Sequence, residues 1–425
     1  MRRWLLRLFL GLFAVLLVFM AVVYLTQFYP RRVPHPPLQL AQGTLAIQHA
    51  RIYISPAQPP IDNGTILISS GLIIAVGQNL PIPPAATLIP CDHCVVTAGF
   101  WNAHVHLSQQ RWSGAEWKKP SELDPYLADM FLSRGFTTVV DLGSNPADTL
   151  SLRRRIESAE LDGPFIYTAT SGLYPPHGVP YYLRETLPGW IVALMPQPDT
   201  PEEARRIVRE NIQSGADLTK LFTGSWVQRG QVLPMPLNIA KAAVETTHLN
   251  GRLVFAHPSD LNGTRVAIDS GVDVLAHAAN QTDGIDEPLL ASAVRKNMSM
   301  IPTLKMFITT EKTPEAAMMP VYAEVRQFHA LGGSLLFGTD VGYMTDYSTD
   351  GEFEALAKCD LDWEDVLAML TTNPAARMGA ADQKGTVTPG KLADLTILDA
   401  DPADNLVNFA RVRAVVRSGR IAWQR

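Results

Sequence analysis

The chain has 425 residues, a formal net charge of -5, a hydrophobic fraction of 47% and a charged fraction of 18%. This length exceeds one small core and indicates about two or three domains. The composition is that of an ordinary globular protein, which excludes a disordered or scaffold protein. The acidic balance excludes a nucleic-acid partner, because binding nucleic acid needs a basic surface.

The first 30 residues form a segment of their own. Arg2, Arg3 and Arg7 precede an uncharged apolar run, residues 8–26, that is long enough to cross a bilayer as a helix. We therefore predict a membrane anchor in residues 1–30, followed by a stiff, proline-rich linker in 31–42. The arginines favour export of the remaining chain to the periplasm or the extracellular space. The alternative is a signal peptide whose cleavage gives a secreted protein.

Residues 43–96 show short alternating apolar runs between turn residues, which predicts antiparallel strands with one turn at DNGT, residues 62–65. Cys91 and Cys94 lie in another predicted turn, where a local disulfide is consistent with export. The same strand pattern returns in residues 379–425, with a hairpin turn expected at Ser418 and Gly419. We expect one small β-sandwich composed of both ends of the soluble chain.

Residues 97–378 alternate apolar strand-like runs with amphipathic helical stretches. The stretches at 201–215 and 236–251 each end near a glycine that can cap a helix. This alternation predicts an α/β fold in which a parallel TIM barrel of eight β/α units fills the region. A doubly wound open sheet is the alternative, but no glycine-rich phosphate-binding motif follows the first strand.

Six polar residues lie at the carboxyl ends of predicted barrel strands. His104 and His106 are two positions apart in one strand, so both side chains emerge on the same face. Lys220, His257, His277 and Asp340 end the runs DLTK, VFAH, VDVLAH and FGTD. Each residue alone could be a hydrogen-bonded loop side chain. The carboxyl ends of barrel strands converge on one mouth, however, and imidazoles with a carboxylate there indicate zinc or a similar metal.

Three motifs resemble the amidohydrolase superfamily. VVTAGFWNAHVHL is similar to its first-strand signature, and FGTD is similar to its last-strand motif. The run LTTNPAARMGAADQKGTVTPGKLADLTILDADP resembles the segment that leaves the barrel for the composite sandwich. The resemblance spans residues 43–425. Lys, His, His and Asp at successive strand ends are similar to the prolidase-like and imidazolonepropionase-like branch.

The resemblance implies a metal-dependent hydrolase with two divalent ions, zinc being the expected metal. His104, His106 and Asp340 would hold the more buried ion. His257 and His277 would hold the more exposed ion. The remaining strand-end residue, the lysine, would bridge the two ions after carboxylation of its amine.

Lys220 also has a physical reason to lose its proton, because burial and two nearby cations both disfavour the ammonium form. The neutral amine can add CO₂ and give a carbamate, whose two oxygens can each bind a metal ion. The alternative is an ammonium group that reaches water along its aliphatic stem.

The expected reaction is hydrolysis of an amide, a cyclic amide or a related carbonyl C–N bond by a metal-activated hydroxide, with esters and dipeptides not excluded. Asp340 would accept the proton of the water and pass it to the leaving amine. Two alternatives stay open. One is a mononuclear deaminase with uncarboxylated Lys220, and the other is a barrel that binds a ligand without catalysis.

Substrate contacts are expected from the loops after the barrel strands. His177, in the proline-rich loop GLYPPHGVPYY, is the first candidate, both as a catalytic group and as a binder of a substrate carboxylate or an oxyanion. Further substrate-binding candidates are Tyr174, Trp226, Tyr343 and Tyr347. The expected partners are a small-molecule substrate and, through the N-terminal helix, a membrane. The sequence leaves a homo-oligomer open.

Two positions depart from the family pattern. Asn102 stands where many relatives carry Asp, and it can hydrogen-bond a metal ligand without strengthening it electrostatically. Pro258, Ser259 and Asp260 follow His257, where prolidase-like relatives more often have a second His and a Gly. This difference weakens an assignment of the substrate by analogy with dipeptidases.

Overall fold

The computed structural model describes residues 7, 9–18, 20, 38–89, 91, 93–310 and 312–425. The globular body consists of a barrel of parallel strands and a sheet to which both ends of the chain contribute. The structure therefore has the α/β, TIM-barrel-like fold that the alternation of apolar runs and amphipathic helices predicts.

The barrel is a ring of eight strands, and every ladder between neighbours is parallel. In order around the ring the strands are β6 (Phe100–Val105), β7 (Phe136–Asp141), β8 (Phe165–Thr168), β9 (Leu218–Leu221), β12 (Leu253–Ala256), β13 (Val274–Ala276), β14 (Ser299–Ile301) and β15 (Ser334–Leu335). Backbone hydrogen bonds outside the ladders close the ring. Leu173 N–H donates to Lys220 O at 2.8 Å, and Ala103 N–H donates to Phe337 O at 2.7 Å. Burial on both faces explains why these strands read as nearly continuous apolar runs.

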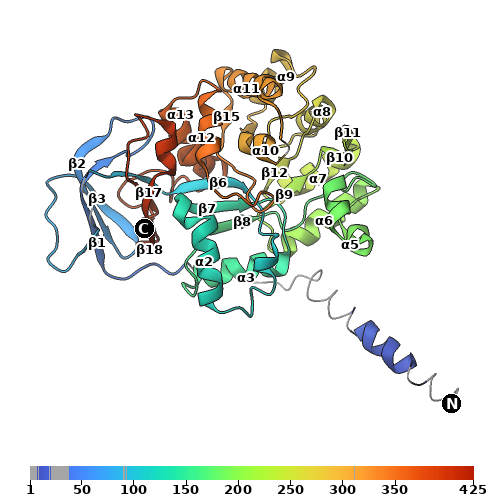
Figure 1. The fold of residues 1–425 in the computed structure, drawn as a ribbon, viewed down its shortest axis with the longest axis horizontal. Helices are drawn as coiled ribbons and strands as arrows, with labels where there is room; N and C mark the ends of the chain where they lie inside the picture. The colour runs from blue at the N-terminus through green and yellow to red at the C-terminus, as the bar shows by residue number, and fades with distance from the viewer. Residues whose placement is uncertain are drawn as a thin grey trace.

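Helices flank the strands on the outside of the ring (Figure 1). They are α2 (Pro120–Met130), α3 (Pro146–Glu157), α6 (Pro201–Ser214), α7 (Leu237–Leu249), α8 (Leu261–Ser270), α9 (Glu287–Arg295), α10 (Leu304–Thr309), α11 (Glu315–Ala330), α12 (Asp350–Ala357), α13 (Trp363–Leu370) and α14 (Thr372–Arg377). The ends of α6 follow from local chemistry. The Thr200 hydroxyl accepts from Glu203 N–H at 3.2 Å, and Gly215 ends the helix with a φ of 113°.

Both ends of the chain build one eight-stranded sheet. Its strands are β1 (Thr44–Ile52), β2 (Ile61–Ser69), β3 (Leu72–Gln78), β4 (Thr87–Ile89), β5 (Val95–Ala98), β16 (Leu395–Leu398), β17 (Val412–Arg417) and β18 (Arg420–Gln424). Antiparallel pairing of β5 with β16 joins the two ends. The sheet folds over itself, because Ile73 N–H donates to Lys391 O at 2.9 Å and one apolar cluster draws on both halves. In its hydrogen bonding, the expected sandwich is therefore one continuous sheet whose two halves share an apolar cluster.

The two predicted turns have different outcomes. Ser418 and Gly419 have φ values of 50° and 80° and connect β17 with β18, as expected for a two-residue hairpin turn. The predicted turn at residues 62–65 is wrong, because these residues lie inside β2. Asn63 has a φ of 51° where the β1–β2 register shifts, so it forms a bulge that asparagine tolerates.

Cys91 and Cys94 form a disulfide with their Cα atoms 5.1 Å apart.

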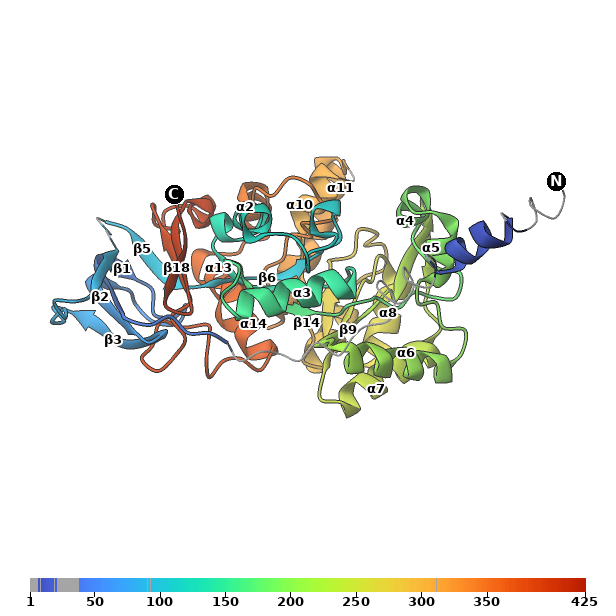
Figure 2. The same cartoon turned by 90° about the horizontal axis from the view of Figure 1, so that it is seen from below.

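Two insertions accompany the barrel. The hairpin of β10 (Gly224–Gln228) and β11 (Gln231–Pro234) follows β9, and the short helices α4 (Tyr181–Thr186) and α5 (Gly189–Leu194) precede α6. The Arg184 guanidinium donates to the carbonyl oxygen of Val227 and so ties α4 to β10. Figure 2 shows α4 and α5 together toward the end of the molecule that lies opposite β1–β3.

Residues 9–18 are helical, and their side chains are exposed. In Figure 1 this helix stands apart from the globular body. Across the described residues, no helix is both long and apolar enough for a membrane span. The predicted anchor at residues 8–26 includes positions outside the described part of the chain. Residues 31–37 of the predicted linker also lie outside it.

Candidate metal centre

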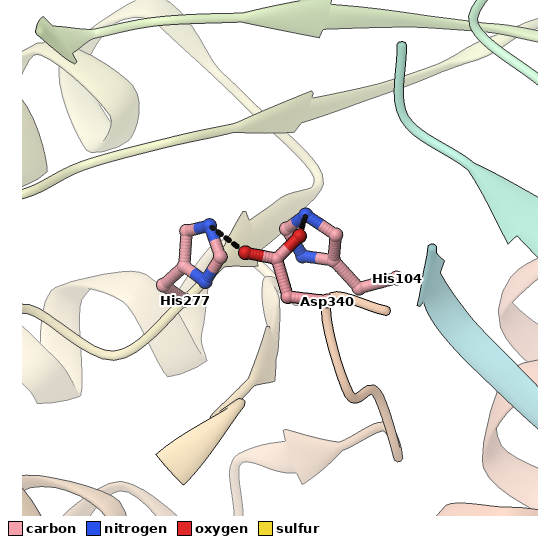
Figure 3. Close-up of side chains that lie close together, drawn as sticks. All are labelled: His104, His277 and Asp340. Atoms are coloured by element: carbon pink, nitrogen blue, oxygen red, sulfur yellow. Dashed lines mark ion pairs between the residues drawn. The ribbon is translucent and has the colours of Figure 1, made fainter. Parts of the chain in front are cut away.

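The six polar residues that end the predicted barrel strands converge at one mouth of the barrel. Asp340 lies centrally among three of the histidines. Its Oδ1 is 3.1 Å from His106 Nε2 and 3.4 Å from His104 Nε2, and its Oδ2 is 4.0 Å from His277 Nε2. Figure 3 shows the Asp340 carboxylate between the His104 and His277 rings. Ligand atoms of these three residues lie within 4.8 Å of one another, which suits a single metal ion.

His277 connects this group to the remaining histidine. The centroid of its ring is 4.4 Å from that of His104 and 4.5 Å from that of His257. The ligand residues therefore form one continuous cluster. The resemblance implies that His277 belongs with His257, whereas in the structure His277 contacts both histidines.

Hydrogen bonds orient two of the imidazoles. His106 Nδ1 lies 2.8 Å from Gly143 O, and His277 Nδ1 lies 2.6 Å from Thr303 Oγ1. The Thr303 hydroxyl donates its own hydrogen to Pro302 O at 2.7 Å, so it can only accept from His277. In both histidines Nδ1 consequently carries the hydrogen, and the Nε2 lone pair is directed into the cluster, as metal binding requires.

Several buried polar atoms in the cluster lack a hydrogen-bond partner. Among the described residues they include both ring nitrogens of His104, Nζ of Lys220 and Oδ1 of Asp340. Each such atom costs about 1–3 kcal/mol when it stays unpaired. Imidazole nitrogens, a carboxylate and an amine are the donors that a divalent ion of the zinc type binds, so the residues fit a metal centre.

Burial governs the electrostatics of the cluster. It lowers the pKa of His104, His257 and His277, and neighbouring positive groups lower each pKa further. These three imidazoles are therefore held neutral, which is the form that binds metals. Burial also acts to lower the pKa of His106, but the interaction with the adjacent Asp340 carboxylate outweighs burial, so the net shift is upward.

Lys220 is enclosed at the centre of the mouth. Its side chain is 1% exposed, which excludes the alternative of an ammonium group that reaches water. Burial lowers the pKa of Lys220 to about 7, with a partial offset from the Asp340 carboxylate. Near neutral pH a large fraction of the amine is therefore unprotonated, as carboxylation requires.

The loop that carries Asp340 is tied to the first strand by Asn102. Asn102 Oδ1 accepts from the N–H groups of His104 and Thr339 at 3.3 and 3.2 Å, and its Nδ2 donates to Thr339 Oγ1 at 2.6 Å. Asn102 thus hydrogen-bonds a proposed metal ligand, as expected, but it does so through the backbone N–H of His104. An aspartate could not donate the third bond, which gives this asparagine a positioning role of its own.

Backbone geometry at the loop is also specific. Asp340 has a φ of 58°, in the left-handed region that aspartate and asparagine tolerate. At Gly342 a side chain is excluded, because a Cβ there would lie 1.8 Å from His106 O. Such backbone conformations are common at functional sites, where the surrounding structure holds them in place.

A cavity of about 1790 Å³ opens from the cluster. Four of the predicted substrate-contact residues line it: His177, Tyr174, Trp226 and Tyr343. Tyr347 is not among the lining residues; its hydroxyl donates to Gln109 at 2.5 Å.

The position of His177 follows from its local sequence. Gly178 N–H donates to Pro175 O at 2.8 Å, and His177 has a φ of 55°. This is the geometry of a type II turn, in which Pro176 occupies the favoured second position. The His177 side chain is exposed and faces the cavity at its rim.

A parallel barrel with a histidine, lysine and aspartate cluster at its carboxyl-end mouth defines a metal-dependent hydrolase. Residues 95–422 match the Amidohydrolase family, and the chain belongs to it. The protein is therefore a hydrolase that acts on carbon–nitrogen bonds of small molecules.

Comparison with individual proteins gives more distant similarities. An imidazolonepropionase of Thermoplasma volcanium is 23% identical over 387 residues, which cover 86% of this chain and 92% of the relative. The crystal structure of a Xaa-Pro dipeptidase has a TM-score of 0.76 at 21% identity and covers 90% of this chain and 100% of that one. The crystal structure of an amidohydrolase has a TM-score of 0.73 at 23% identity, with 89% and 98% coverage. At these identities the two structures show the fold alone.

Proposed function

We propose that the chain hydrolyses an amide, cyclic amide or related carbonyl C–N bond with two zinc ions held at the mouth of the barrel. The proposed ligands are His104, His106, His257, His277 and Asp340, with carboxylated Lys220 as the bridge. The buried atoms of His104, Lys220 and Asp340 that lack a hydrogen-bond partner carry this proposal, because each residue offers a metal-ligand atom to the same cluster. Membership of the Amidohydrolase family supports a carbon–nitrogen bond as the target.

The chemistry divides between the ions and the side chains. Bound zinc ions would acidify a water molecule and polarise the substrate carbonyl. Asp340 accepts the proton of the attacking water at Oδ1 and delivers it to the leaving nitrogen. As the C–O bond forms and the C–N bond breaks, His177 at the rim donates a hydrogen bond to the developing oxyanion. The products are a carboxylic acid and an amine.

Metal analysis tests this proposal. We expect about two zinc ions per chain in protein purified without chelator, and about one in His257→Ala, which removes a ligand. His248→Ala is the matched control, because His248 is exposed and pairs with Asp273 at 2.9 Å, and it should keep both ions. One ion in the unaltered protein would favour the mononuclear deaminase. No ion after reconstitution with zinc would favour the barrel that binds without catalysis.

We also propose that residues 8–26 anchor the protein in a membrane with the barrel outside the cytoplasm. The uncharged apolar run and the preceding arginines support the anchor, and the Cys91–Cys94 disulfide is consistent with an oxidising compartment. The full chain should stay with the membrane fraction after alkaline carbonate extraction, and external protease should digest the barrel in intact cells. Release by carbonate would contradict the anchor, and protection from protease would contradict the orientation.

A further inference from the structure

An apolar wall runs from the metal cluster into the cavity. The Phe222 ring stacks on His257 with centroids 5.0 Å apart and 23° between the planes. On the same wall Phe222 stacks on Tyr174, at 4.5 Å and 28°. Both Phe222 and Tyr174 line the cavity, so a continuous aromatic surface begins at a proposed metal ligand.

The helices α4 and α5 extend this wall. Leu183, Val192 and Met195 pack against the cluster formed by Tyr174, Val179 and Phe222. Neither helix contains a fully buried side chain, and the bond from Arg184 is one of the contacts that tie the pair to the body.

A second apolar group lies on α5. Trp190, Ile191 and Leu194 are close together because of their helical spacing, and all three line the cavity. Trp190 is 56% exposed and Leu194 is 46% exposed. Large apolar side chains that remain exposed around a cavity are typical of a ligand-binding surface.

Positive charge is scarce in the cavity. Among the described lining residues the lysine and arginine side chains are Lys220 and Arg206. Lys220 belongs to the metal cluster. Arg206 forms ion pairs with Glu210 at 2.9 Å and Glu203 at 3.6 Å. A carboxylate on the substrate would therefore lose water without gaining a Lys or Arg partner, which is costly.

We propose that the substrate is an uncharged amide with an extended apolar group. The apolar group lies along Phe222 and Tyr174 and ends against Trp190 and Leu194 on α5. This inference rests on the proposed function, which brings the scissile bond to the metal cluster. It departs from a dipeptide-like substrate, whose carboxylate would lie along a wall that offers no Lys or Arg side chain beyond Lys220 and the ion-paired Arg206 among the described lining residues.

Two substrate pairs test the inference on the full chain. In the first pair, octanoyl-p-nitroanilide is compared with acetyl-p-nitroanilide. Burying one methylene changes an equilibrium about fourfold, so partial burial of the chain should raise kcat/KM by at least about tenfold. In the second pair, N-octanoylglycinamide should be hydrolysed about tenfold faster, or more, than N-octanoylglycine, because only the latter carries a carboxylate. Equal rates within the first pair, or preference for the acid in the second, would overturn the inference.

Variants on α5 identify the surface involved. Trp190→Ser and Leu194→Ser should each lower the ratio of octanoyl to acetyl kcat/KM by about fivefold or more. Leu249→Ser is the matched control, because Leu249 on α7 is 88% exposed and lies outside the cavity, and it should keep the ratio. An unchanged ratio in both α5 variants would overturn the placement.

Binding separates this inference from the proposed function. Calorimetry should show octanamide binding at least about tenfold more tightly than acetamide or octanoate, whether or not any amide is hydrolysed. Inert amides with this binding order would refute the proposed hydrolysis and support the apolar site. Hydrolysis of amides without tighter binding of octanamide would support the proposed hydrolase and overturn the inference of an apolar site.

Discussion

Lys220→Ala should lower kcat/KM by about a thousandfold, which corresponds to about 4 kcal/mol of transition-state stabilisation. The variant removes the amine that we expect to be carboxylated and to bridge the two ions. The buried position of Lys220 and the downward shift of its pKa to about 7 favour the unprotonated amine that carboxylation needs. As the pH falls below 7, the unprotonated fraction of the Lys220 amine decreases. We therefore expect added bicarbonate to slow the loss of activity that the unaltered protein shows at acid pH.

Chemical rescue distinguishes a lost bridge from a damaged fold. Acetate or propionate can occupy the space of the missing side chain and supply two oxygens, so either salt should restore part of the activity and of the zinc content of Lys220→Ala. Lys241→Ala removes an exposed lysine from α7 and should behave like the unaltered protein. Full activity in Lys220→Ala would refute the bridge. Zinc binding without rescue would show that the lysine acts in another way.

The barrel was predictable because its signal repeats along the chain. Most strands lie in apolar runs, and helices such as α6 have a cap and an amphipathic face that can be recognised locally. The turn predicted at residues 62–65 failed because asparagine and glycine allow the same backbone conformation in a turn and in a bulge. The register in which β2 pairs with the preceding strand β1 decides between the two.

The metal cluster was predictable for a similar reason, because barrel topology brings all strand ends to one mouth. The sequence could not show which histidines of the cluster contact one another, because the contact of His277 with both His104 and His257 depends on side-chain packing. Thr303 was missed, although a polar residue directly after a strand such as β14 could have indicated it.

The apolar cavity wall was also missed. Phe222 directly follows the strand that carries the lysine, and α5 comes from a proline-flanked apolar run, PGWIVALMP. Apolar residues in such positions are normally read as core. Only the fold shows that Trp190 and Leu194 remain exposed around the cavity that opens from the metal cluster.

Asp340→Asn should leave the fold intact and lower kcat by about a thousandfold or more, since one side chain serves as both metal ligand and proton acceptor. Asparagine is the informative substitution because it has the same shape and tolerates the φ of 58° at this position, whereas alanine would add backbone strain. The amide cannot take the proton of the attacking water. The ring nitrogens of His104 and His106 near Oδ1 would also lose their carboxylate partner.

Zinc content separates the two roles of Asp340. If both ions remain while kcat collapses, the lost function is proton transfer; if one ion is lost, the carboxylate is needed first as a ligand. Asp404→Asn, in an exposed loop of the terminal sheet, is the control and should keep both the ions and the rate. Turnover by Asp340→Asn at the rate of the unaltered protein would exclude this carboxylate as the base. A different side chain or an external base would then have to accept the proton of the water and pass it to the leaving amine.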